Sequence, residues 1–148
     1  MSTIRISDEW WTSPSTAESG AAVIVTLRTD LENVRATDKY IYRVEVTWQY
    51  KGDDKGLPSL ADSLLMEQAT DALNDVFNAD PVAVMTGIYT GDNERNWVFY
   101  TRSLNIFQKK FNLALAELPP MPLDFYVEED ADWSEYQMTL EGLETGDF

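Results

Sequence analysis

The chain has 148 residues, and its 11 Lys and Arg against 26 Asp and Glu give a formal net charge of −15 at pH 7. It contains no His and no Cys, which excludes Ser-His-Asp and Cys-His nucleophiles, zinc sites of Cys/His type, the usual haem and iron–sulfur ligation, and disulfides. This length and a hydrophobic content of 44% predict a single domain, residues 1–148, with a buried core.

The N-terminal segment, residues 1–39, is predicted to extend or flank the main sheet with two strands. One lies in the stretch 4–11, which is rich in Ile and Trp, and the other spans Ala21–Arg28, with the polar residues 12–20 between them. The first residues lack the basic start and apolar run of a signal peptide, and no stretch approaches the roughly 18 consecutive apolar residues of a membrane helix. We therefore expect a cytoplasmic protein without membrane attachment.

A strand over residues 40–50 and the helix after it follow from two different periodicities. Apolar residues alternate with polar ones along the strand, at Tyr42, Val44, Val46, Trp48 and Tyr50. After a polar loop, Ser59 and Asp62 have the spacing of an N-cap and an acidic third helical residue. Apolar residues then recur at steps of three and four, which predicts an amphipathic helix from Ser59 to Asn78.

A hairpin and a second helix are predicted next. Two β-rich runs at 82–90 and 96–102 are separated by the turn residues 91–95, which favours an antiparallel hairpin. Ser103 can cap a helix that runs to Leu118, where two prolines end it.

The C-terminal part is predicted to contain a strand at 121–128 and then a short helix. Asp132 and Glu135 have the spacing of an N-cap and a third helical residue. Trp133 and Tyr136 are three residues apart and therefore share one helix face. We expect this pair to pack back on the domain.

The order of elements from Tyr40 to Glu128 is β-α-β-β-α-β. This order is typical of an α+β, ferredoxin-like fold, in which two helices cover one face of a four-stranded antiparallel sheet. The predicted organisation is an N-terminal strand extension (1–39), a ferredoxin-like core (40–128), and a C-terminal helix and tail (129–148), frayed at 144–148. One core is expected to hold five aromatic residues, namely Trp48, Phe77, Phe99, Phe111 and Phe125.

Acidic residues are concentrated in the last part of the chain. Residues 111–148 hold ten carboxylates and no Lys or Arg, which makes −10 of the −15. Because a nucleic-acid binder needs a basic surface, direct nucleic-acid binding is not expected. The acidity either serves solubility alone or forms an exposed edge that docks a basic segment of another protein. The partner-binding residues predicted on this edge are Glu128, Glu129, Asp130 and Asp132.

The sheet face opposite the two helices is predicted to be mostly polar, with Arg43, Glu45, Thr47, Gln49, Asp124, Tyr126 and Glu128. Tyr89 and Tyr100 are possible neighbours on this face. Base stacking there is unfavourable beside so many acids. We expect the N-terminal strands or a second subunit to cover the face, so a homodimer is an open alternative.

Carboxylates also suit hard cations and acid/base chemistry. Counted from Asp130, Asp132 and Glu141 occupy positions 3 and 12 of an EF-hand loop, but Glu135 stands at position 6, where the turn needs Gly. No spacing of the carboxylates selects an acid/base pair. No catalytic residue, cofactor or metal site is therefore predicted, and a small carboxylate- or cation-dependent hydrolase is the alternative to a non-enzymatic module.

Several motifs occur in one order along the chain: Tyr42-Arg-Val-Glu-Val-Thr-Trp48, Gly56-Leu-Pro58, Trp97-Val-Phe-Tyr-Thr-Arg102 and Glu128-Glu-Asp-Ala-Asp-Trp-Ser-Glu-Tyr136. Over nearly its whole length the chain resembles the bacterial family called domain of unknown function 695, with Ala131 where proline is expected. This family has no established activity or catalytic residues to transfer. Its relatives can occur beside a domain similar to the regulator of ribonuclease activity B, an acidic ferredoxin-like ribonuclease inhibitor. The resemblance implies, by analogy, a protein-binding role linked to RNA metabolism.

Overall fold

Within residues 4–145, which the computed structural model describes, the chain forms six strands and four helices. The strands are β1 (Trp10–Thr16), β2 (Ala22–Arg28), β3 (Tyr42–Gln49), β4 (Ala83–Gly91), β5 (Glu94–Thr101) and β6 (Leu123–Glu129). The helices are α1 (Glu32–Arg35), α2 (Leu60–Ala79), α3 (Leu104–Leu115) and α4 (Ser134–Thr145). None of these helices is long and apolar enough to cross a membrane.

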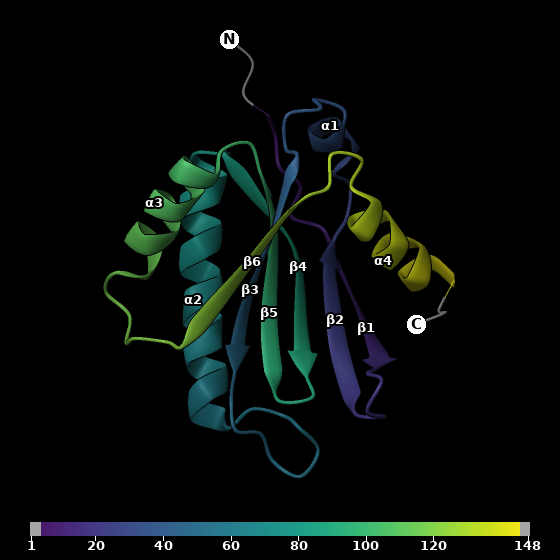
Figure 1. Ribbon diagram of the computed structural model, residues 1–148, viewed down its shortest axis with the longest axis vertical. Coiled ribbons are helices and arrows are strands. Elements are labelled where there is room, and N and C mark those ends of the chain that lie inside the picture. Colours follow the sequence, from purple (N-terminus) through teal and green to yellow (C-terminus); the bar gives the residue numbers. More distant parts are fainter. Residues whose placement is uncertain (1–3, 146–148) are drawn as a thin grey trace.

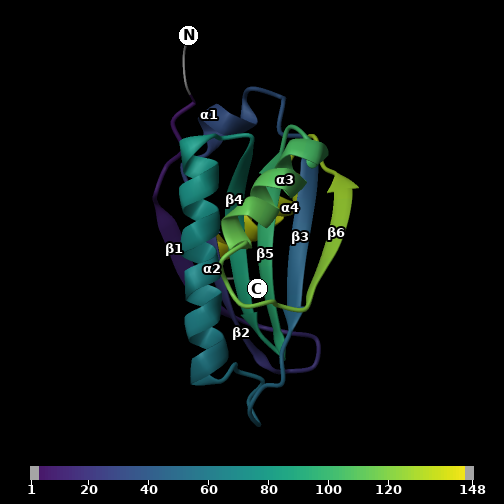
Figure 2. The same ribbon diagram turned by 90° about the vertical axis from the view of Figure 1, so that its left-hand side faces the viewer.

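The six strands form one antiparallel sheet with the order β1-β2-β4-β5-β3-β6 (Figures 1 and 2). The predicted α+β class is confirmed, and β1 and β2 extend the sheet beyond β4 as expected. The position of the first strand was wrong: β1 begins at Trp10 and pairs with β2 as far as Thr16, through residues expected to be a connection. An edge strand is largely exposed, so its polar residues gave no alternating signal.

Helices α2 and α3 lie on the same face of the sheet, as predicted (Figure 2). Both begin at the predicted caps. The Ser59 hydroxyl accepts a 3.1 Å hydrogen bond from the Asp62 backbone N–H, and the Ser103 hydroxyl accepts one of 3.3 Å from that of Ile106. Each bond satisfies an N–H group that the first helical turn leaves unpaired. Helix α3 ends earlier than predicted, because residues 116–118 tighten into a turn with bonds to carbonyls three residues back.

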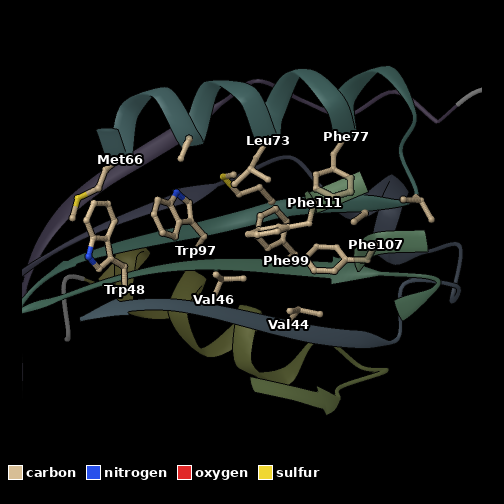
Figure 3. Close-up of a cluster of buried hydrophobic side chains, with 14 of the residues drawn as sticks. Val44, Val46, Trp48, Met66, Leu73, Phe77, Trp97, Phe99, Phe107 and Phe111 are labelled. Carbon is tan, nitrogen blue, oxygen red and sulfur yellow. The ribbon is translucent and has the colours of Figure 1, made fainter. Parts of the chain in front are cut away.

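The main core lies between the sheet and these two helices, as Figure 3 shows. Four of the five aromatic residues predicted to share one core are buried in it, namely Trp48, Phe77, Phe99 and Phe111. The prediction that Phe125 is buried in this core was wrong. Its ring centroid lies 5.0 Å from that of Phe111, but 49% of the residue is exposed. Because β6 is an edge strand, it has a neighbouring strand on one side only, and the core does not enclose Phe125.

A second core occupies the opposite face of the sheet, beneath α4. Its buried residues come from the N-terminal part of the chain, from the central strands β4 and β5, and from the C-terminal part: Leu27, Leu31, Val34, Tyr40, Val84, Tyr100, Trp133 and Tyr136. The prediction that Trp133 and Tyr136 pack back on the domain is confirmed. The expectation that the N-terminal strands cover this face was wrong, because α4 packs on it while β1 and β2 continue the sheet (Figure 1). Glu144 and Thr145 continue α4, and residues 146–148 of the predicted frayed tail lie outside the described range.

Candidate functional site

The segment that links β6 to α4, residues 129–133, is organised around the carboxylate of Asp130. Its two oxygens accept hydrogen bonds from the Tyr100 hydroxyl at 2.6 Å, the Ser134 backbone N–H at 3.0 Å, the Ser134 hydroxyl at 2.7 Å and the Glu135 backbone N–H at 3.0 Å. Two of these donors are N–H groups of the first turn of α4, which would otherwise lack partners. Asp130 therefore caps α4, in place of the predicted Asp132.

These contacts set the ionisation of Asp130 and Tyr100. Burial by itself opposes ionisation of Asp130, but the four donors outweigh it and hold the pKa of this carboxyl below its ordinary value. Burial, together with the hydrogen bond to ionised Asp130, raises the pKa of the Tyr100 hydroxyl far above its ordinary range. At neutral pH the pair is therefore a carboxylate and a neutral phenol, which is a stable structural arrangement.

Trp133 fixes the direction in which the chain enters α4. The residue has φ of 56°, in the left-handed region, and its side chain is fully buried. The indole N–H donates a 2.8 Å hydrogen bond to the backbone carbonyl of Tyr40, and the ring stacks on Tyr100 with centroids 4.3 Å apart. This burial holds the β6–α4 link against the body of the protein.

Arg35, which ends α1, holds the link from outside. Its guanidinium donates to the backbone carbonyl of Asp132 at 2.7 Å and to the side-chain oxygen of Gln137 at 2.6 Å. The link is thus held at both ends, so the backbone that carries its exposed carboxylates has a defined position.

The four predicted partner-binding residues have different environments. Glu129 and Asp132 are exposed. Glu128 is half-buried, and its carboxylate lies 3.5 Å from the guanidinium of Arg43. The prediction that Asp130 is exposed was wrong, because the residue is buried and its oxygens accept hydrogen bonds from donors of the same chain. The fully exposed part of the predicted edge is therefore Glu129 and Asp132, with Glu128 half-buried beside Arg43, and Asp130 does not belong to it.

Sequence reasoning missed the apolar surface that adjoins this acidic edge. Three consecutive β6 residues are exposed, Phe125 at 49%, Tyr126 at 58% and Val127 at 44%. A groove of about 270 Å³ lies between α3 and β6 and is lined by Val44, Leu104, Phe107, Gln108, Asn112, Phe125 and Val127. The alternation in this segment indicated a strand, but its place at the edge depends on the topology.

A second groove, of about 680 Å³, lies between α2 and the sheet extension and was also missed. Its walls include the carboxylates of Glu67 and Asp71 from α2 and the guanidinium of Arg95 from β5. Burial lowers the pKa of Arg95 to about 10, and its guanidinium carbon lies 5.4 Å from the ring centroid of Trp97. The groove exists because β1 and β2 continue the sheet past α2, and the position of α2 relative to these strands depends on the tertiary structure.

No group of three or more His, Cys, Asp or Glu residues is placed to hold a metal ion among the residues that the structure describes. The EF-hand-like spacing that begins at Asp130 therefore does not correspond to a gathered set of ligands. The carboxylate at its first position is already the cap of α4.

Comparison with known proteins identifies a family whose sequence model matches most of the chain. Residues 8–140 match the sequence model of DUF695, described as a family of unknown function. The match includes both the sheet extension and most of α4. No curated protein matches the chain.

Proposed function

Since the chain belongs to the family of unknown function DUF695, we propose a role from its own surface: it is a non-enzymatic acidic module that docks a basic segment of another protein. The observation that carries this proposal is that Glu129 and Asp132, whose side chains are exposed, are carried by a backbone segment that hydrogen bonds hold against the domain. A backbone segment that is already ordered loses little conformational entropy when a partner binds, which favours specific association over loose attraction.

The electrostatics of the whole chain support the same role. The net charge of −15 attracts a basic partner over a distance, and most of that charge comes from residues 111–148. Such attraction accelerates association and weakens as salt screens it.

The finer fold assignment is also part of the proposal. We assign the segment from β3 to β6 to a ferredoxin-like unit, and the order β4-β5-β3-β6 with α2 and α3 on one face supports this assignment. The setting that we propose, regulation of RNA metabolism through a protein partner, rests on the analogy to acidic ferredoxin-like inhibitors alone.

The experiment compares two double charge reversals in affinity capture at low and high salt. Glu129→Lys with Asp132→Lys alters the acidic edge. Asp54→Lys with Asp75→Lys is the matched control, because both residues are exposed, lie elsewhere, and give the same change in net charge. We expect a basic protein to be captured at low salt and lost only with the first variant. Capture that is indifferent to both variants and to salt would contradict the proposal.

A carboxylate-dependent hydrolase is the second candidate, and the groove beside α2 is the observation that favours it. Two carboxyl groups, those of Glu67 and Asp71, line this groove together with Arg95, and carboxyl groups are among the side chains that serve as general acids and bases. If this function is correct, a hydrolytic activity found by substrate screening is lost in Glu67→Gln or Asp71→Asn. It is retained in Glu129→Lys with Asp132→Lys.

A further inference from the structure

The two edges of the sheet are built differently. β1, at one edge, carries Pro14 in the middle of the strand, and proline cannot donate a backbone hydrogen bond to an added strand. β6, at the other edge, has no proline, lysine or arginine within Leu123–Glu129. Figure 2 shows β6 and β1 at opposite sides of the sheet. Proline therefore hinders strand addition at one edge, whereas the other edge has no proline and carries only acidic charges.

The backbone of β6 is available along its outer side. Within residues 4–145, β3 is the only strand that pairs with β6. Because backbone groups in an antiparallel strand point alternately to either side, a row of N–H and carbonyl groups of β6 faces away from β3. The side chains of Phe125, Tyr126 and Val127, on the same strand, are also exposed.

The helix side of the edge suits apolar side chains. Phe125 and Val127 line the groove of about 270 Å³ whose other wall is α3, with Leu104 and Phe107. Side chains of a strand alternate between faces, so every second residue of an added strand would lie beside this groove. Apolar side chains there would cover surface that is now exposed.

The opposite side of the edge suits basic side chains. Asp124, Tyr126 and Glu128 share this face, since they alternate with the groove residues. The neighbouring base is Arg43, which contacts both Glu45 at 3.1 Å and Glu128 at 3.5 Å and so leaves the face acidic. Lys or Arg on an added strand would lie opposite these carboxylates.

A second copy of the chain fits this edge poorly. An antiparallel pair of β6 strands centred on Tyr126 would set Asp124 of one copy opposite Glu128 of the other. Like charges directly opposite each other destabilise a sheet, and each copy carries a net charge of −15. Charge complementarity selects a basic occupant.

We propose that β6 accepts an extended segment of a partner protein as an added strand, in which Lys or Arg alternates with apolar residues. This inference rests on the proposed function and specifies its mode of binding. The backbone hydrogen bonds supply affinity. The groove beside α3 binds the apolar side chains of the added strand, and the acidic face binds the basic ones, so both contribute specificity.

The test uses two labelled peptides of about ten residues, enough to span a strand. Both alternate Lys with Val, and one is N-methylated at every backbone amide, so it keeps the charge but loses its backbone donors. We expect the first peptide to bind in fluorescence anisotropy and the second to bind about tenfold more weakly or not at all. Amides of β6, and none of β1, should gain protection from hydrogen exchange.

Two protein variants locate the site. Phe125→Thr with Val127→Thr places strand-favouring β-branched residues at both positions but removes the apolar contacts, and we expect about tenfold weaker binding. Trp11→Thr is the control, because Trp11 is an exposed aromatic residue on the opposite edge strand. Denaturant melts establish that both variants are folded.

The outcomes separate this inference from the proposed function. If both peptides bind equally and the Glu129/Asp132 reversal weakens both, strand addition is wrong while docking of basic segments stands. If neither peptide binds but Glu129→Lys with Asp132→Lys still abolishes capture of a basic protein, strand addition is again wrong. If the chain dimerises and Phe125→Thr with Val127→Thr abolishes the dimer, a second copy is the occupant and the basic segment is not.

Discussion

The hydroxyl of Tyr100, on β5, donates a 2.6 Å hydrogen bond to the carboxylate of Asp130, which also caps α4. This contact connects the sheet to the C-terminal helix through two buried polar groups. A residue predicted to meet a partner is thus part of the internal structure.

Replacement of Asp130 by Ala is expected to lower the free energy of unfolding by about 2–4 kcal/mol. The change removes a helix cap, and it leaves the Tyr100 hydroxyl without its acceptor in a buried site. Urea denaturation measures the loss. Glu129→Ala is the control and should change stability by less than about 0.5 kcal/mol, because Glu129 is exposed. Equal effects of the two substitutions would show that the cap contributes little.

The stabilisation by Asp130 should depend on pH. Its folded-state pKa is lowered, so its contribution is complete above the ordinary pKa of Asp, about 4, and is lost as the pH falls through the folded-state value. The difference in unfolding free energy between the wild type and Asp130→Asn should therefore be constant from about pH 5 to 8 and shrink below about pH 4. Urea melts across this range measure it. A difference that grows in acid would contradict the assigned ionisation.

Most elements could be predicted because each has a strong local signal. Ser59 and Ser103 each accept a hydrogen bond from the backbone N–H three residues later. Because this contact is so local, the sequence predicts both helix caps correctly. The start of α4 could not be placed in the same way. Asp132 and Glu135 have the right spacing, but burial of Trp133 at φ 56° delays the helix and transfers the cap to Asp130.

The candidate surfaces depended on contacts between distant parts of the chain. An exposed acidic edge could be predicted from charge density alone, and Glu129 and Asp132 are exposed. The burial of Asp130 depends on Tyr100, thirty residues earlier, and no periodicity encodes that contact. The grooves likewise depend on where α2, α3 and the strand extension lie relative to one another.

The difference between Phe111 and Phe125 can be measured directly. Phe111→Ala is expected to lower the unfolding free energy by about 3–5 kcal/mol, since the residue is buried in the main core. Phe125→Ala should cost about 1 kcal/mol, because roughly half of that side chain is already in water. Guanidinium melts of the two variants provide the comparison. A loss for Phe125 as large as that for Phe111 would place both in one closed core.

Trp133→Ala is expected to cost about 3–5 kcal/mol. The ring is buried between Tyr100 and Tyr136, and its N–H bonds the Tyr40 carbonyl, so the substitution leaves both a cavity and an unpaired buried acceptor. Trp11→Ala should cost about 1 kcal/mol, like Phe125→Ala, because about half of Trp11 is already in water. Thermal and urea unfolding followed by far-UV circular dichroism report both. A small effect of Trp133→Ala would mean that α4 folds without this anchor.

The last prediction concerns Arg28, a charged residue of which 1% is exposed. Its guanidinium donates a 2.9 Å hydrogen bond to the side-chain oxygen of Asn74 and lies 4.5 Å from the ring centroid of Trp10. Its Nε and Nη1 atoms have no acceptor among the residues that the structure describes. Burial accordingly lowers the pKa of Arg28 to about 10, which shows that the charged form is disfavoured in this site.

Because the cost of burying this charge exceeds what one hydrogen bond and one aromatic contact return, Arg28→Met should keep or raise stability, by up to about 4 kcal/mol. Met fills a similar volume without the charge. Arg28→Ala should lower stability instead, since it opens a cavity between α2 and β1. Urea melts of the two variants at neutral pH distinguish the effect of removing the charge from the effect of removing side-chain volume. If Arg28→Met destabilises as strongly as Arg28→Ala, the contacts to Asn74 and Trp10 outweigh the desolvation of the guanidinium.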